Sequence, residues 1–152
     1  MEAMKGVWMM RRRAVLLFVL VAVTLVVVSG VAFAVTRVGG PGSDALSGTD
    51  ARDTLIGKGG NDSLDGRQRG DRLFGDRGQD AIKGGRGADV LDSGPRNESA
   101  RDALDGGRGK DRLRVRNVPA AEDAVTCGRG FDRVFADRLD VVDSDCERVR
   151  LP

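Results

Sequence analysis

Apolar residues recur at every ninth position through the middle of the chain. Six nonapeptides follow one another from residue 39 to residue 92, and after four inserted residues (93–96) two more, 97–105 and 106–114, restore the register. The eighth place of every repeat is Leu or Ile: Leu46, Leu55, Leu64, Leu73, Ile82, Leu91, Leu104 and Leu113. One apolar residue between two variable positions predicts a very short strand over places seven to nine, with its central side chain pointing inward.

The polar places of the repeat are as regular as the apolar one. The sixth place is always Asp: Asp44, Asp53, Asp62, Asp71, Asp80, Asp89, Asp102 and Asp111. Gly opens seven of the eight repeats and often fills places two and four, where it permits sharp turns with positive φ. The pattern therefore predicts an all-β solenoid in which two repeats, with two turns and two strands, complete one coil.

Stacking such coils brings carboxylates together. Coils about 4.8 Å apart place each repeat beside the next but one, so the aspartates form two columns. One column contains Asp44, Asp62, Asp80 and Asp102, and the other contains Asp53, Asp71, Asp89 and Asp111. Carboxylates at this spacing repel one another unless a cation lies between them. Ca²⁺ suits the gap because it accepts six to eight oxygen ligands in flexible geometry, including turn carbonyls.

The repeat resembles the RTX, or haemolysin-type, calcium-binding repeats, whose pattern is G-G-x-G-x-D-x-U-x with U a large apolar residue. The sequences GGPGSDALS, GGRGADVLD and GGRGKDRLR match every fixed place. The resemblance covers residues 39–114 and extends to a degenerate copy, CGRGFDRVF, at residues 127–135. It implies a right-handed parallel β-roll with Ca²⁺ between turns, and it assigns metal ligation to the eight aspartates and provisionally to Asp132.

Departures from the family pattern rank the predicted sites. Ala51 and Arg69 replace the fourth-place Gly, and the seventh repeat has Asn97, Glu98 and Ala100 at places where the family has Gly. We therefore expect the best sites where matching repeats meet, and weaker or empty sites elsewhere. The best pairs are Asp44 with Asp62, Asp62 with Asp80, and Asp89 with Asp111, whereas sites involving Asp53, Asp71 or Asp102 are expected to be weaker.

The N-terminal segment has a different pattern. Three arginines at 11–13 precede an apolar run over residues 14–28, and Ala32 and Ala34 follow with the spacing of a signal-peptidase site. Residues 1–34 therefore read as a signal peptide cleaved before Val35, which makes the protein secreted. The alternative is an uncleaved anchor at residues 14–34, long enough to span a bilayer, with the rest of the chain on the outer face of the cytoplasmic membrane.

Composition makes the metal necessary to the predicted fold. Residues 1–34 hold 25 of the 61 apolar residues, which leaves 36 in the following 118. That is too few to offset chain entropy by burial alone. Net charge is +2 overall and +3 in residues 1–34, so the rest carries −1. The alternating signs do not suggest polyanion binding, and the arginines at variable places read as a solvated surface. The alternative is a flexible Gly/Asp-rich linker, but such a linker would not require Leu or Ile at every ninth position.

Residues 115–152 are predicted to form a C-terminal cap. The nine-residue phase is lost after Arg114, and apolar residues return from Val134 onward. Solenoid ends need caps because they expose their last apolar layer. Cys127 and Cys146 are the only cysteines, and in an exported chain we expect them to form one disulfide. A zinc site lacks support because the chain has no His and no C-x-x-C.

These features favour an exported calcium-binding protein that folds on Ca²⁺ binding and has a structural or surface-interaction role. The alternatives are a membrane-anchored adhesion module, or an export or accessory remnant of a repeat-bearing hydrolase or toxin. We expect no enzyme activity, because His-dependent catalysis is excluded and the repeat already accounts for the aspartates. Calcium is the expected partner and cell-surface components are candidate further partners. Nucleic acid is not expected, because only three Phe lie after residue 34.

Overall fold

The computed structural model describes residues 32–95, 100–115 and 121–151. The basic residues and the apolar run of the predicted signal peptide or anchor lie outside these ranges. Within them the chain is built from short strands and turns, with no helix. Accordingly, the described part offers no helical segment with the length and apolar character needed to cross a bilayer.

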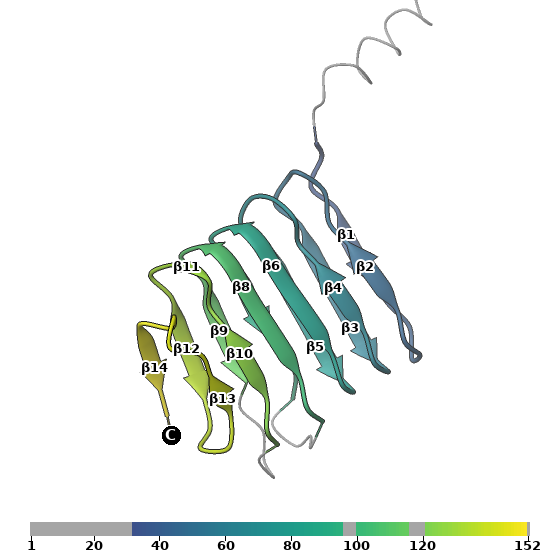
Figure 1. Cartoon of the computed structure of the whole chain (residues 1–152). Coiled ribbons are helices and arrows are strands. Elements are labelled where there is room, and N and C mark those ends of the chain that lie inside the picture. The colour runs from purple at the N-terminus through teal and green to yellow at the C-terminus, as the bar shows by residue number, and fades with distance from the viewer. Residues whose placement is uncertain (1–31, 96–99, 116–120, 152) are drawn as a thin grey trace, which may run out of the picture. The chain divides into compact units, whose positions relative to one another are not determined.

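The strands form two sheets, and in each sheet the strands of successive coils lie side by side (Figure 1). The first sheet has the order β1-β3-β5-β7-β9-β12-β14 and the second β13-β10-β8-β6-β4-β2, with β11 paired to β8. The strands of the first sheet are β1 (Thr36–Val38), β3 (Thr54–Gly59), β5 (Arg72–Arg77), β7 (Val90–Asp92), β9 (Arg112–Val115), β12 (Arg133–Ala136) and β14 (Arg148–Arg150). Those of the second are β2 (Ala45–Ser47), β4 (Ser63–Asp65), β6 (Ala81–Gly87), β8 (Ala103–Gly109), β10 (Ala124–Thr126), β11 (Arg129–Gly130) and β13 (Val141–Val142).

Every strand pairing is parallel and aligns equivalent places of the repeat. Leu55 lies beside Leu73 and Leu64 beside Ile82, so two repeats make one coil. The insertion at 93–96 does not disturb this register, because Ile82 still lies beside Leu104 and Leu91 beside Leu113. Ser93 itself stays in the coil, because its amide donates to the carbonyl oxygen of Arg114 at 2.9 Å. The predicted all-β, parallel β-roll is confirmed.

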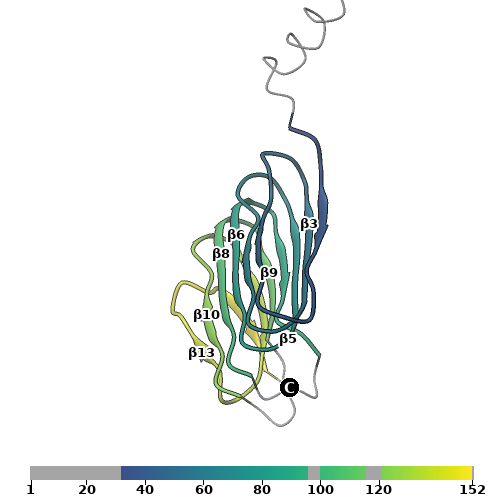
Figure 2. The same ribbon diagram turned by 90° about the vertical axis from the view of Figure 1, so that its right-hand side faces the viewer.

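The core lies between the two sheets, which face each other as two layers, and each sheet contributes one row of eighth-place side chains to it (Figure 2). The eighth-place residues from Leu55 to Leu113 are all buried, and only Leu46, on β2 at the edge of the second sheet, is partly exposed. Alternation along each three-residue strand explains this pattern, because places seven and nine point to solvent. Because most strands contribute one buried apolar side chain each, the core supplies little apolar burial.

Glycine is required where turns of neighbouring coils touch. Gly60 has a φ of 100°, and a Cβ built on it would lie 2.5 Å from the carbonyl carbon of Gly42. Four other residues also adopt positive φ without being Gly: Lys58, Arg67, Arg69 and Asp76. They occupy places two and four of their repeats, so the turn conformation is kept even where the family glycine is replaced.

The C-terminal segment predicted to form a cap adds strands to both sheets, although the nine-residue phase is interrupted after Arg114. Val125 on β10 pairs with Leu104, and Val134 on β12 pairs with Leu113. Strands β13 and β14 then add to β10 and β12. The sequence conceals this continuation because successive coils differ in length there, with Asp123 following Asp102 by 21 residues, and residues 116–120 lie outside the described ranges.

Candidate metal centre

Two columns of acidic side chains run along the turns of the roll. Each sixth-place Asp directly precedes a strand, so parallel pairing of the strands aligns the acids of successive coils. The first column contains Asp44, Asp62, Asp80, Asp102, Asp123 and Asp140, and the second contains Asp53, Asp71, Asp89, Asp111, Asp132 and Glu147. The structure thus brings together all eight predicted aspartates in the predicted columns.

One carboxylate oxygen of each acid is held by the backbone of the preceding coil. The amide of Asp53 donates to Oδ1 of Asp71 at 2.7 Å, and the amide of Asp71 donates to Oδ1 of Asp89 at 2.7 Å. The first column repeats the contact, with the amide of Asp62 donating to Oδ1 of Asp80 at 2.8 Å. These bonds fix the orientation of each carboxylate and aim its second oxygen along the turn.

The second oxygen, Oδ2, is buried without a hydrogen-bond partner in many of these residues. Among the described residues this holds for Asp62, Asp71, Asp89, Asp111 and Asp132. A buried carboxylate oxygen with no donor is costly, since burial removes its water without replacing it. Such atoms are where a bound cation would restore the lost interaction.

The N-terminal coil differs from the coils that follow it. Oδ2 of Asp44 accepts the amide of Gly40 at 2.6 Å. Oδ2 of Asp53 accepts both the amide of Thr49, at 2.5 Å, and its hydroxyl, at 3.0 Å. The chain itself therefore supplies hydrogen bonds to Oδ2 of these two residues. By contrast, Oδ2 of Asp71 has no hydrogen-bond partner, like Oδ2 of Asp62. The sequence-based ranking of sites remains a prediction, but this contrast favours the inner coils over the first one.

The unpartnered Oδ2 atoms of Asp62, Asp71, Asp89 and Asp111 each lie near a backbone carbonyl oxygen, across a space that only Gly leaves open. A Cβ on Gly66 would lie 2.7 Å from Oδ2 of Asp71 and 2.5 Å from the carbonyl oxygen of Gly84 in the next coil. A Cβ on Gly84 would likewise lie 2.7 Å from both Oδ2 of Asp89 and the carbonyl oxygen of Gly106. First-place glycines thus keep a carboxylate oxygen and a carbonyl oxygen close together.

Electrostatics indicate that the carboxylates need compensation. Burial raises the pKa of Asp71 to about 7; the amide of Asp53 lowers it, while the charges of Asp89 and Asp53 add to the increase. Burial likewise raises the pKa of Asp111 to about 7 and that of Asp89 to about 6. Without a cation, these groups would hold protons near neutral pH.

The donor set fits calcium. It consists of carboxylate and backbone carbonyl oxygens, which are the ligands that this hard cation prefers. Nitrogen and thiolate donors are not part of it. The nearest sulfur atoms belong to Cys127 and Cys146, which are joined to each other with their Cα atoms 5.2 Å apart. Asp145 lies beside this disulfide and accepts the amides of Cys127 and Gly128, so it closes a turn.

Three members of the columns were not predicted from the sequence, and a fourth was predicted only provisionally. Asp132 takes its expected place, accepting the amide of Asp111 at 2.8 Å. Asp123, Asp140 and Glu147 were not foreseen. A signal for Asp123 was present, because it stands nine residues before Asp132 and two before Val125. Asp140 and Glu147 each precede a Val by two residues in the same way.

Comparison with known proteins identifies the repeat. The family model described as RTX calcium-binding nonapeptide repeat (4 copies) matches residues 38–68 and 65–95. No curated protein and no solved structure matches the chain. The matched residues contain six of the eight aspartates predicted from the sequence. Residues 38–95 of the chain are thus RTX calcium-binding nonapeptide repeats, and Ca²⁺ is the cofactor of these repeats.

Proposed function

We propose that this chain is an exported protein whose β-roll folds when Ca²⁺ binds and then serves a structural or surface-interaction role without catalysing a reaction. The observation that carries the proposal is the row of buried carboxylate oxygens without a partner, represented by Asp62, Asp71 and Asp89. The ligands on this chain are the sixth-place aspartates from Asp44 to Asp111, and the same role extends to Asp123 and Asp132.

Calcium binding and folding are coupled because the carboxylate and carbonyl ligands of a site come together only in the folded chain. The carbonyl of Gly84 meets the carboxylate of Asp71 only after two coils have stacked. Most strands contribute only one buried apolar side chain to the core, so the binding free energy of the metal becomes a large part of the folding free energy. Extracellular calcium modules bind with Kd of roughly 10⁻⁴ to 10⁻³ M. Sites of that affinity fill outside a cell and stay empty inside it.

Two features support export. Residues 1–34 have the pattern of a signal peptide, and Cys127 pairs with Cys146, which is a bond typical of oxidising compartments. A non-catalytic role is supported by the chemistry available. The sequence holds no His, and the described acids of the columns are committed to backbone hydrogen bonds and to the metal.

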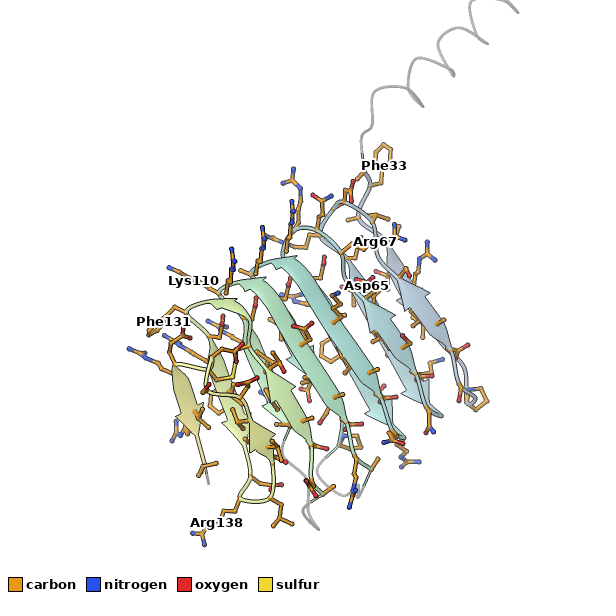
Figure 3. The ribbon with its side chains drawn as sticks, in the orientation of Figure 1. Phe33, Asp65, Arg67, Lys110, Phe131 and Arg138 are labelled. Atoms are coloured by element: carbon orange, nitrogen blue, oxygen red, sulfur yellow. A yellow bond between two sulfur atoms is a disulfide. The ribbon has the colours of Figure 1, made fainter. Side chains whose placement is uncertain are left out.

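The test is a calcium titration followed by circular dichroism, with calorimetry to count bound ions. We expect a coil-to-β transition near millimolar Ca²⁺. Asp71→Asn should move the midpoint to higher calcium and lower the stoichiometry, because Oδ2 of Asp71 is a bare ligand. Asp65→Asn is the matched control, since Asp65 lies at the ninth place outside the columns (Figure 3). The absence of a transition, or equal behaviour of the two variants, would contradict the proposal.

Export is tested separately by the mass of the protein isolated from the producing cells. Cleavage before Val35 predicts a chain of 118 residues in the medium, because 34 of the 152 residues are removed. An intact chain in the membrane fraction would favour the anchored alternative. A chain that stays inside the cell would refute export in either form.

A further inference from the structure

Five arginines gather on the outer face of one sheet, over the adjacent strands β9, β12 and β14. We call this surface the arginine face, and its members are Arg112, Arg114, Arg133, Arg148 and Arg150. All five are exposed. They occupy places seven and nine, where side chains leave the roll, so the fold presents them together.

The arginine face is ordered by the strand register. Arg133 is the Cα partner of both Arg112 and Arg148, so these three stand in one row across three strands. Neighbouring strands lie about 4.8 Å apart. In the second row Phe135 lies between Arg114 and Arg150 and is partly buried. The result is a flat grid of guanidinium groups with one aromatic ring inside it.

Most of this charge is not balanced by the protein. Arg114 pairs with Asp92 at 3.1 Å, and Arg148 lies 4.9 Å from the ring centroid of Phe131. Within the described residues, Arg112, Arg133 and Arg150 have no carboxylate at ion-pair distance. Like charges directly opposite each other on neighbouring strands destabilise a sheet. The grid therefore costs stability, and an anionic ligand would offset that cost.

The adjoining turns extend the cationic surface. Arg86, Arg108 and Arg129 are Cα partners in successive coils and lie along the turn edge that leads into the first sheet. Arg67 and Lys110 are at the same edge in Figure 3. The outer face of the second sheet is different, with exposed Ala81, Ala103 and Ala124 in one row.

Calcium binding strengthens this asymmetry. The chain is near neutral overall, yet the sixth-place aspartates from Asp53 to Asp111, which count against the arginines, are buried in the columns. Each bound Ca²⁺ adds two positive charges there, so these aspartates compensate the outer arginines less. The sequence predicts that arginines at variable places form a solvated surface. It does not show that the fold brings several of them together on one face.

We propose that the arginine face binds a linear acidic polysaccharide. Guanidinium groups pair with carboxylate or sulfate oxygens in bidentate fashion, and rows of them match the regular spacing of charges on such a polymer. Phe135 offers a small apolar surface to a sugar ring. Nucleic acid fits less well because base stacking needs more aromatic side chains than this face has. The choice of an extracellular polymer rests on the proposed export, but the charge pattern does not.

The test uses the calcium-loaded full chain with dextran sulfate as the probe and neutral dextran as the polymer control. We expect binding to dextran sulfate that weakens with salt, and none to dextran. The triple variant Arg112→Gln, Arg133→Gln and Arg148→Gln should bind about tenfold more weakly, from the loss of three exposed ion pairs. The matched control Arg77→Gln, Lys83→Gln and Arg101→Gln removes the same charge elsewhere and should bind like the parent chain.

Equal losses in the two triple variants would overturn the proposal, because binding would then follow net charge alone. Tighter binding to single-stranded DNA, or to vesicles containing anionic lipid, than to dextran sulfate would overturn the assignment to polysaccharide. Circular dichroism with calcium, recorded on every variant before polymer is added, separates this outcome from failure of the proposed function. A chain that folds with Ca²⁺ but ignores dextran sulfate refutes only the present inference.

Discussion

Gly42 and Gly60 occupy the same fourth place in adjacent coils, yet the structure predicts opposite responses to alanine. A Cβ on Gly60 would lie 2.5 Å from the carbonyl carbon and 2.6 Å from the amide nitrogen of the turn at Gly42 and Ser43. The φ of Gly60 is 100°. A Cβ on Gly42 would meet nothing within 4 Å. Gly60→Ala and Gly42→Ala are thus a matched pair.

The expected magnitudes follow from three contributions. Positive φ costs an L-residue about 1–2 kcal/mol. Forcing the turns apart adds about 1–3 kcal/mol, as in other overpacked sites. Replacing Gly also stabilises by about 0.4–1 kcal/mol, because the unfolded chain loses freedom. Gly60→Ala should therefore lower the free energy of unfolding by about 2–4 kcal/mol, and Gly42→Ala should leave it unchanged or raise it slightly.

The assay is unfolding by guanidinium chloride in saturating Ca²⁺, followed by far-ultraviolet circular dichroism. The midpoint should fall for Gly60→Ala and not for Gly42→Ala, with similar slopes. Equal midpoints for the two variants would refute the reasoning. They would mean that the turns of the first two coils do not stack as the strand register requires.

Three further predictions concern the core, the disulfide and pH. Leu73→Ala should destabilise by about 3–5 kcal/mol, and Leu46→Ala by less because Leu46 is partly exposed; equal losses in denaturant unfolding would contradict the buried row. Replacing Cys127 and Cys146 by Ser opens a loop with a sequence separation of 19 and should cost about 3 kcal/mol; protection of β12 amides from hydrogen exchange reports it, and unchanged protection would count against the pairing. Folding raises the pKa of Asp71 and Asp111 from 3.8 to about 7, so the metal-free roll binds extra protons between these values and loses stability as pH rises. Protons compete with Ca²⁺, and the calcium midpoint should rise as pH falls from 8 to 6; a pH-independent midpoint would argue against these ligands.

The repeat could be predicted from the sequence because each of its places has a local cause. The position of Leu73 follows from the alternation of side chains along a short strand. The position of Asp71 follows from the turn that precedes this strand. Once two repeats make a coil, both the core row and the columns follow by simple counting. The family resemblance then adds the identity of the metal.

The continuation beyond Arg114 could not be counted in this way. Coil lengths differ there, and Asp123 follows Asp102 by 21 residues whereas Asp62 follows Asp44 by 18. Register in that region is set by the backbone pairing of β10 with β8 and of β12 with β9. The satisfied Oδ2 of Asp53 was equally hidden, because it depends on the Thr49 hydroxyl folding back.

The arginine face could not be recognised from the sequence, because net charge averages over arginines and aspartates that the fold separates. Arg112, Arg133 and Arg148 are separated by 21 and 15 residues, and aspartates stand between them in the sequence. Only the fold sends the aspartates of the columns inward and the arginines of the arginine face outward. Net charge therefore gave no indication of the charge on one side of the roll.

The most direct test of the account is the size of the chain from Val35 in solution, measured by small-angle X-ray scattering with Ca²⁺ and after dialysis against EDTA. The metal-bound chain should have a radius of gyration near that of a folded chain of its length, about 14 Å. Removal of Ca²⁺ should expand it toward the value for an unfolded chain, about 35 Å. A chain that stays equally small in EDTA would contradict the claim that calcium holds these coils together.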